Sequence, residues 1–486
     1  MRICLVGLWL CTVVLSLSFC SIGSTDDSTD RVAESKESLI AKRTCSSCHE
    51  YVPPDMLDRI TWPRVLSVMQ SEMAKQEIQV SMEDWVAIRN HYLNNSPPIF
   101  QSSAPAIVPE KQKLFKLKTV SATINKGISA TLLEYVSEVN QIFIGSSDGY
   151  IGTVAAEEVS IICQLDNIPV DLLHSGEGLY MLQMGSLKPS NSPTGRVVSW
   201  NPLDCTSDMI VDSLIRPVHL SQGLAESDLH HFIISSFGST IGKLPTGGVY
   251  IHILNSNETK SIEELPGATQ AIYCDINHDG ANELLALYSQ GNERINSYSL
   301  SADSVSSTTL LSFPPVHGTN SFDISDIDGD GFLDIIVTNG DNDDYSQIYK
   351  PYHGVRIFKN DGSSQFTESY FYRINGASKV KSADFDMDGD VDFVVLAMYP
   401  DLFSRPWESV LYFENKGSEN FQVYRFEDVS LANWILMDVA DIDKDGDTDI
   451  IVAPNMSIGG LIPPETRNNW IRNGIIMGTY INQTIP

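Results

Sequence analysis

Four short acidic segments recur at nearly equal intervals in the second half of the chain, and they constrain its fold more than any other feature. Each fits the pattern D-x-[DN]-x-[DN]-G-x-x-[DE]. They begin at residues 275, 326, 384 and 441, so successive starts are 51, 58 and 57 residues apart. A unit repeated at this period indicates a fold built from similar blocks placed side by side.

The spacing of the carboxylates within each segment predicts calcium binding. Side chains at loop positions 1, 3 and 5 converge on one point, the glycine at position 6 permits a sharp turn, and position 7 offers a backbone carbonyl. We expect the ligands to be Asp275, Asn277, Asp279 and Glu283; Asp326, Asp328, Asp330 and Asp334; Asp384, Asp386, Asp388 and Asp392; and Asp441, Asp443, Asp445 and Asp449.

The residues after each loop exclude an EF-hand. An EF-hand has a glutamate at position 12 that leads into a helix. Here position 12 is alanine or valine in every copy, and each loop runs into a short apolar segment such as Ile335-Ile336-Val337. Such runs are typical of buried β-strands, so the sequence predicts a loop followed by a strand.

This loop-and-strand unit resembles the FG-GAP or VCBS repeat of integrin-α-like β-propellers, over roughly residues 110–486. Units near Pro169 and Pro217 keep the frame without the acids, and one near Ile142 brings the total to about seven. The resemblance implies a mainly β fold, a propeller of about seven four-stranded blades with calcium-binding loops. We expect a strand near residues 114–117 to close the ring.

The first 23 residues predict an export signal. Arg2 precedes an almost wholly apolar run from Ile3 to Phe19, and small or polar residues follow. An uncleaved N-terminal anchor is the alternative, and Leu17–Cys20 weakly resembles a lipoprotein site that would place a lipid anchor on Cys20. We expect a periplasmic, cell-surface or secreted protein with no further membrane span. A disulfide between Cys163 and Cys205 is compatible with such a compartment.

A haem attachment motif lies near the N-terminus. Cys45-Ser46-Ser47-Cys48-His49 carries the C-x-x-C-H signature of c-type haem. Two thiols three positions apart near a helix start can reach the two vinyl groups of haem, and His49 is then the proximal iron ligand. The alternatives are a zinc site or a redox C-x-x-C pair, but no second Cys/His pair lies in this segment. The predicted cofactors are therefore haem c and calcium.

The surroundings of the motif resemble a compact cytochrome c domain over residues 31–96. Helices are expected at 31–43 and 82–93, and they would enclose residues 62–69. The resemblance implies a methionine as the sixth iron ligand, for which Met69 is the first candidate and Met73 and Met56 are alternatives. Residues 97–109 read as a linker because of their proline, serine and asparagine content.

The loops between the second and third strands of the blades are the expected binding surface. They are long in several blades and would gather on the face opposite the calcium loops. The segment from Asn339 to His353 is the richest, and its His353, Lys350 and Tyr345 are the candidate catalytic or substrate-contacting residues. A single loop histidine more often satisfies a backbone carbonyl, so that alternative stays open.

The charge balance restricts the function. The chain has 32 Lys+Arg and 62 Asp+Glu, a net charge of −30, which argues against nucleic acid. Three functions remain: an electron-transfer protein whose propeller binds a redox partner protein or glycan; an oxidoreductase acting on a small molecule or glycan at the loop face, with haem as electron acceptor; and a cell-surface adhesin. Since no nucleophile elbow, phosphate loop or dinucleotide fingerprint appears, the sequence favours the first.

Overall fold

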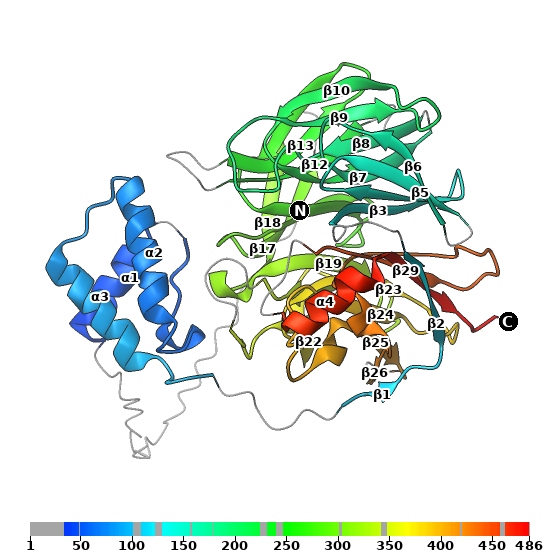
Figure 1. Cartoon of the computed structure of the whole chain (residues 1–486). Helices are drawn as coiled ribbons and strands as arrows, with labels where there is room; N and C mark the ends of the chain where they lie inside the picture. Colours follow the sequence, from blue (N-terminus) through cyan, green and yellow to red (C-terminus); the bar gives the residue numbers. More distant parts are fainter. Residues whose placement is uncertain are drawn as a thin grey trace, which may run out of the picture.

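The computed structural model describes residues 34–47, 49–100, 108–121, 129–155, 158–176, 178–223, 231–239, 246–300, 304–341, 348–417, 420–456 and 462–485. Within these residues, seven β-sheets form a propeller, and three α-helices precede it (Figure 1). The expected fold class is thus confirmed. No helix in the described ranges is long and apolar enough to span a membrane.

The N-terminal region is a small helical unit. Ser35 caps the first helix by accepting a hydrogen bond from the Ser38 N–H at 3.1 Å, and Ser81 caps the third by accepting one from the Asp84 N–H at 3.0 Å. Buried Trp62 and Tyr92, with ring centroids 4.0 Å apart, form the centre of its core. The elements are α1 (Lys36–Cys45), η1 (Pro54–Met56), α2 (Trp62–Lys75) and α3 (Met82–Asn95).

The position of the haem motif corrects one expectation. Cys45 is the last residue of α1, so the motif follows the end of a helix and does not lie near a helix start. The Ser46 N–H donates to the Lys42 carbonyl and closes the last turn. The chain then leaves the helix, and Cys48 lies outside the described residues.

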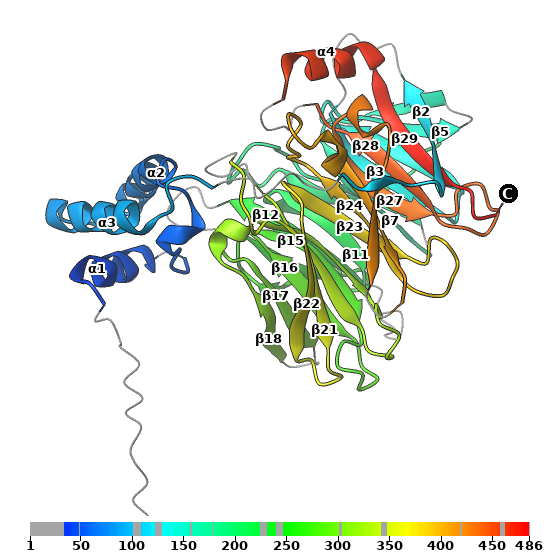
Figure 2. The ribbon, with the colours of Figure 1, turned by 90° about the horizontal axis from the view of Figure 1, so that it is seen from below.

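The seven blades follow in chain order, each with its first strand innermost. In Figure 2 the strands of the fourth blade lie side by side. The strands of blades 1 to 4 are β3 (Ala130–Val136), β4 (Gln141–Ser146), β5 (Tyr150–Ala155) and β6 (Glu158–Gln164); β7 (Pro169–Ser175), β8 (Gly178–Gln183), β9 (Gly195–Trp200) and β10 (Ser207–Leu214); β11 (Pro217–Gln222), β12 (His231–Ser239), β13 (Thr246–Ile253) and β14 (Glu258–Glu263); and β15 (Ala268–Cys274), β16 (Glu283–Tyr288), β17 (Arg294–Leu300) and β18 (Val305–Ser312).

The last three blades carry the additional elements of the propeller. Short helical turns and one α-helix lie in the connections, namely η2 (Pro315–His317), η3 (Pro406–Ser409), η4 (Val429–Leu431) and α4 (Pro464–Asn473). The strands are β19 (Thr319–Ser325), β20 (Asp334–Asn339), β21 (Gly354–Asn360) and β22 (Phe366–Arg373); β23 (Ala377–Ala383), β24 (Asp392–Ala397), β25 (Val410–Asn415), β26 (Phe421–Arg425) and β1 (Glu110–Lys111); and β27 (Trp434–Ala440), β28 (Asp449–Pro454), β29 (Ile475–Asn482) and β2 (Phe115–Ser121).

An early strand closes the ring. β2 pairs antiparallel with β29, placing Leu117 opposite Tyr480, and so becomes the outer strand of the last blade. The expectation of a closing strand near residues 114–117 is confirmed. β1 adds a further strand in parallel to β26 of blade 6, so the start of the propeller region is tied to two neighbouring blades.

The core lies between the blades. One hydrophobic cluster of buried residues fills each of the seven junctions, and an eighth lies inside the helical unit. Every residue of β20 and of β28 is buried. Because such a strand packs on both neighbouring blades, it needs apolar residues on both sides, which explains the unbroken apolar run after each acidic loop.

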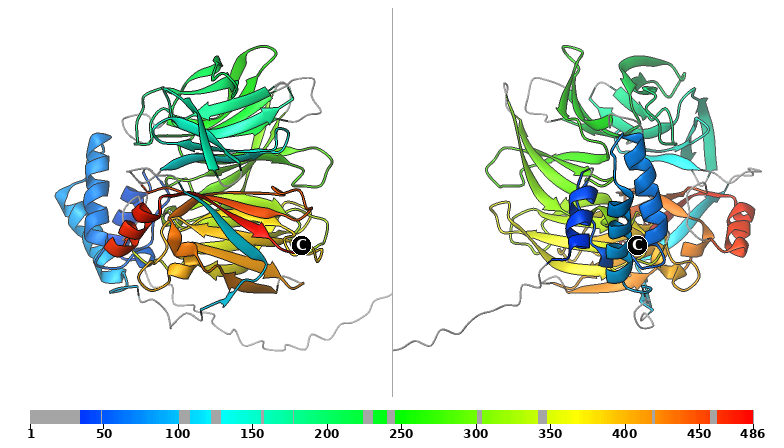
Figure 3. Two further views of the ribbon diagram at one scale, coloured as in Figure 1. Left: turned by 45° about the vertical axis from the view of Figure 1, so that its right-hand side comes forward. Right: turned by 90° about the vertical axis from the view of Figure 1, so that its left-hand side faces the viewer.

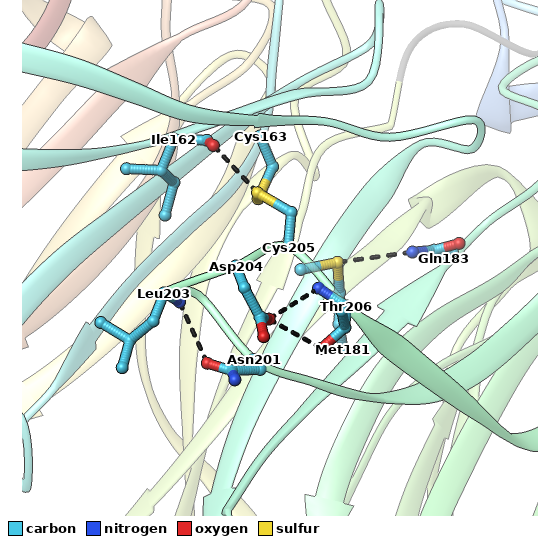
Figure 4. Close-up of a disulfide and its surroundings, with 9 residues drawn as sticks. All are labelled: Ile162, Cys163, Met181, Gln183, Asn201, Leu203, Asp204, Cys205 and Thr206. Atoms are coloured by element: carbon cyan, nitrogen blue, oxygen red, sulfur yellow. Dashed lines mark hydrogen bonds between the residues drawn. A yellow bond between two sulfur atoms is a disulfide. The ribbon is translucent and has the colours of Figure 1, made fainter.

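A disulfide joins the first two blades. Cys163 of β6 is bonded to Cys205, which lies in the turn between β9 and β10 (Figure 4). Asp204 orders this turn by accepting hydrogen bonds from the N–H and hydroxyl of Thr206. The disulfide anticipated from the sequence is therefore present.

The helical unit lies against the propeller (Figure 3). The Tyr352 hydroxyl, in the long loop of blade 5, donates a hydrogen bond to the Met56 carbonyl at 2.6 Å. Val316 and Ile348 of the same blade pack against the helical core. A Cβ built on Gly291 of blade 4 would lie 3.6 Å from the Cβ of His49, so the end of the unit that carries the haem motif contacts the propeller.

Candidate functional site

The acidic loops join the first and second strands of blades 4 to 7, and three of them gather their carboxylates. In each of these three loops, carboxylate oxygens from positions 1, 3 and 9 lie within 4.8 Å of one another. The groups are Asp326, Asp328 and Asp334; Asp384, Asp386 and Asp392; and Asp441, Asp443 and Asp449. Hard oxygen ligands at this spacing suit calcium.

Backbone hydrogen bonds shape each loop. In blade 6, the two oxygens of Asp384 accept from the N–H groups of Asp388 and Gly389, both at 3.1 Å. Gly389 has a φ of +97°, a conformation that favours glycine over other residues. The position-5 carboxylate of Asp388 accepts from the Asp390 N–H at 3.0 Å, and it is not among the three converging groups.

The first loop is arranged differently. The Asn277 amide nitrogen donates to Asp279 at 3.1 Å and to Glu283 at 3.0 Å. In the described chain these residues form no group of three converging carboxylates. An asparagine at position 3 thus pairs with its own neighbours, and calcium stays a prediction at this loop as at the other three.

The pKa values of the position-9 carboxylates are raised above that of an ordinary aspartate. Burial raises the pKa of Asp392 to about 7, and burial likewise raises the pKa values of Asp334 and Asp449 to about 6. Repulsion by neighbouring loop carboxylates is part of the same increase in pKa. A divalent cation would relieve this repulsion, because it favours the ionised form of every ligand around it.

Three asparagines complete the loops, and the sequence reasoning missed them. Asn360, Asn415 and Asn482 each end the third strand of a calcium-loop blade, and each N–H donates to the position-9 aspartate at 2.7–2.9 Å. A signal exists in the sequence, because each asparagine stands two residues after an aromatic residue, as in Phe413-Glu414-Asn415.

The same asparagines link successive loops around the ring. The Asn415 side chain donates to the Ile327 carbonyl, in the loop of blade 5, at 3.1 Å. The Asn482 side chain donates to the Phe385 carbonyl, in the loop of blade 6, at 2.7 Å. The order of one loop therefore depends directly on that of the next.

The candidate residues of the opposite face are mostly buried. His353 has no exposed surface and Lys350 is 5% exposed, while Tyr345 lies outside the described residues. The His353 Nε2 lies 3.5 Å from the Val316 carbonyl, and its Nδ1 has no partner among the described residues. Burial and the nearby Lys350 lower the pKa of His353 well below its usual value, so this imidazole is neutral.

Two groups of polar contacts lie near His353, at the end of blades 5 and 6 that is called the rim from here on. Arg356 donates to the Asn339 side chain at 2.7 Å and to the Tyr352 carbonyl at 2.9 Å. The buried carboxylate of Glu408 accepts from Arg373 at 3.0 Å and from Arg405 at 3.1 Å. The rim is therefore polar and largely buried at the ends of blades 5 and 6.

Two features of the described part of the C-x-x-C-H motif are compatible with haem, which stays a prediction. Half-buried Cys45 borders the helical core, as do Met56 and Met69. The His49 Nδ1 lies 2.7 Å from the Glu50 carbonyl, and an Nδ1–H that donates to a carbonyl leaves Nε2 available as a metal ligand. Cys45, His49 and Met69 would hold the haem together with Cys48, in apolar surroundings.

One comparison with known proteins supports the repeat over part of the chain. The model of the FG-GAP-like repeat matches residues 275–337, from the first acidic loop into β20. No curated protein matches the chain. The similar solved structures include the Neurospora crassa Pan2 WD40 domain (13% identity, 76% of this chain and 96% of that chain, TM-score 0.45), a gluconolactonase from Xanthomonas campestris (9%, 60% and 94%, 0.39) and an auxiliary nutrient binding protein from Bacteroides thetaiotaomicron (10%, 62% and 75%, 0.39).

Proposed function

We propose that the chain is an exported c-type haem protein that transfers electrons, and that its calcium-stabilised propeller is the platform on which it binds a redox partner protein or a glycan. One observation carries this proposal: the end of the helical unit with the haem motif contacts the propeller. His49 lies next to Gly291, and the Tyr352 hydroxyl donates to the Met56 carbonyl. The disulfide supports export, since such bonds persist in oxidising compartments.

The residues of the helical unit have defined tasks in this function. Haem supplies a one-electron redox centre when it is bound. Cys45 and Cys48 attach it, His49 coordinates from Nε2, and the Glu50 carbonyl fixes the ring of His49. A thioether from Met69 would favour the reduced iron, which suits electron transfer.

The proposal is tested on the full chain exported into a compartment that matures c-type cytochromes. We expect a sharp reduced α-band and haem that stays with the protein after acid–acetone extraction. Cys45→Ser should lose the covalent attachment, and the matched variant Cys274→Ser should keep it. A colourless protein would overturn the haem assignment.

A second function, oxidation of a small molecule at the rim, is favoured by one observation. The contacts of the helical unit fall on the rim beside His353 and Lys350, so electrons released there would have a short path to haem. Addition of candidate sugars or alcohols to the oxidised protein would then reduce the haem. Absence of such reduction would rule out this second function.

A further inference from the structure

The innermost strand of every blade carries the same irregularity, and this identifies the side chains that face the propeller axis. In all seven strands the pairing with the second strand shifts between the first and third residues. The fourth residue is buried in every blade. Because side chains alternate along a strand, the third and fifth residues point to the other side, and most of them are half-buried.

These axial positions form two layers, and many of their residues are polar. The third-residue layer is Leu132, Asp171, His219, Gln270, Ser321, Lys379 and Leu436, and the fifth-residue layer is Glu134, Leu173, Ser221, Ile272, Asp323, Lys381 and Asp438.

At five of the seven junctions, an axial side chain lies at a backbone N–H of the next blade. The innermost strand is a sheet edge, so its outward N–H groups have no strand partner. The contacts are Asp171 with Leu220 at 2.6 Å, His219 with Ala271 at 3.5 Å, Gln270 with Phe322 at 3.3 Å, Asp323 with Ser382 at 2.7 Å and Asp438 with Tyr135 at 3.0 Å.

Blade 6 breaks this pattern. Its axial residues, Lys379 and Lys381, are donors and cannot accept an N–H. Neither ammonium group has a hydrogen bond or an ion pair within 4 Å among the described residues, and the same is true of the Glu134 carboxylate on blade 1. Departures from an otherwise regular local rule are where function is expected.

The groups around the two lysines define what could bind there. Asp171, Asp438 and Asp323 already accept backbone N–H groups, whereas Glu134 is free to accept a hydrogen bond. Burial and the neighbouring Lys381 lower the pKa of Lys379, and burial and Asp438 raise the pKa of Glu134. Two adjacent ammonium groups attract one carboxylate, but the surrounding acids repel a second negative charge. The remainder of the ligand must then donate a hydrogen bond.

We propose that the axis of the propeller binds a small hydroxycarboxylate with a single negative charge, such as a sugar acid. Lys379 and Lys381 hold its carboxylate, and Glu134 accepts a hydrogen bond from one of its hydroxyls. This site is separate from the calcium loops and from the rim, so it does not depend on the proposed electron transfer.

The test is calorimetric titration of the full-length protein, in calcium, with three probes. Galacturonate has both a carboxylate and hydroxyls, galactose lacks the carboxylate, and adipate has two carboxylates without hydroxyls. We expect binding of galacturonate only. The double variant Lys379→Met with Lys381→Met should weaken it about tenfold or more, since hydrogen bonds to charged groups are lost. Lys260→Met, on the exposed outer strand β14, should leave it unchanged.

Several outcomes would overturn the proposal. These are no heat with galacturonate, equal affinity in the double lysine variant, or adipate binding as tightly as galacturonate. If the double variant does not fold, Glu134→Ala provides the second measurement. It removes the hydroxyl acceptor and one repelling charge, so the preference for galacturonate over adipate should fall. An unchanged preference would count against the site.

Discussion

At the scale of single residues, the position-9 aspartates explain the design of the calcium loops. Each is buried, accepts two backbone N–H groups and still faces two further carboxylates. Hydrogen bonds alone do not offset the burial, since the pKa values of these groups stay raised. A bound cation would offset this repulsion, and a change at position 9 should then remove both a ligand and the anchor of the loop.

Replacement of Asp334 by Asn should abolish calcium binding at blade 5. At free calcium about 100 times the dissociation constant, one site contributes about 2.7 kcal/mol to the free energy of unfolding, so the calcium-dependent part of the stability should fall by about that amount. Denaturant unfolding with and without calcium measures it. Asp208→Asn, on the exposed strand β10, is the control, and an equal loss in both variants would contradict the assignment.

The same aspartates predict how the calcium-free protein responds to pH. Their pKa values of about 6 to 7 exceed that of an unfolded aspartate, about 3.9. Between about pH 4 and pH 7 the folded chain therefore binds more protons than the unfolded chain, and its stability falls as pH rises. Melting in chelator should thus occur at lower temperature at pH 7.5 than at pH 5.5. Calcium should abolish this difference, and a melting point that rises with pH in chelator would refute the prediction.

At the scale of elements, the propeller is stabilised by contacts between neighbouring blades. Each hydrophobic cluster lies between two blades, and the asparagines at the ends of the third strands connect neighbouring calcium loops. The first blades lack both the acids and these asparagines. In their place, the disulfide between β6 and the turn before β10 joins blades 1 and 2.

Loss of this disulfide should destabilise the propeller substantially. The bonded cysteines are 42 residues apart, and closing a loop of that length in the unfolded chain corresponds to about 4 kcal/mol. Cys163→Ser with Cys205→Ser should lower the free energy of urea unfolding by about this amount. Reductant should bring the unmodified protein to the same value and leave the variant unchanged. A variant as stable as the parent would show that the bond adds nothing.

At the scale of the whole molecule, the loop from Lys350 to His353 connects the two parts. The Tyr352 ring stacks on His317 at 4.7 Å, while its hydroxyl reaches the helical unit at Met56. The His353 ring lies near the Val316 carbonyl, and Arg356 donates a hydrogen bond to the Tyr352 carbonyl. Both contacts fix the position of this loop. We therefore expect these residues to position the helical unit on the propeller.

Tyr352→Phe should loosen that contact without unfolding either part. The stacked ring is retained and one hydrogen bond is lost, about 1 kcal/mol, so amide exchange in residues 49–57 should speed up by about fivefold. Tyr370→Phe is the matched control, because the Tyr370 ring of blade 5 packs on Phe421 of blade 6. Unchanged exchange in these residues would show that Tyr352 does not hold the unit.

The sequence by itself determined the blade repeat and the loop positions, because both depend on local patterns. It also predicted a closing strand near residues 114–117, but only the fold shows that this strand pairs with β29. An acidic turn followed by a short apolar run, without the glutamate at position 12 of an EF-hand, is typical of a loop entering a strand buried on both faces. The period of the turns then sets the length of the blade. Helices were expected at residues 31–43 and 82–93, the second from its apolar spacing, and α1 and α3 overlap these ranges. The bounds of α2 were not predicted.

Only the tertiary structure decided which residues meet across blades. Four features depend on neighbours 40 to 300 residues away in sequence, as with Asn415 and Ile327 or Tyr352 and Met56. They are the burial of His353, the asparagines that join one loop to the next, the contact of Tyr352 with Met56, and the two lysines on the axis. Local spacing carries no information on such pairs, since the angle between blades and the closure of the ring bring them together.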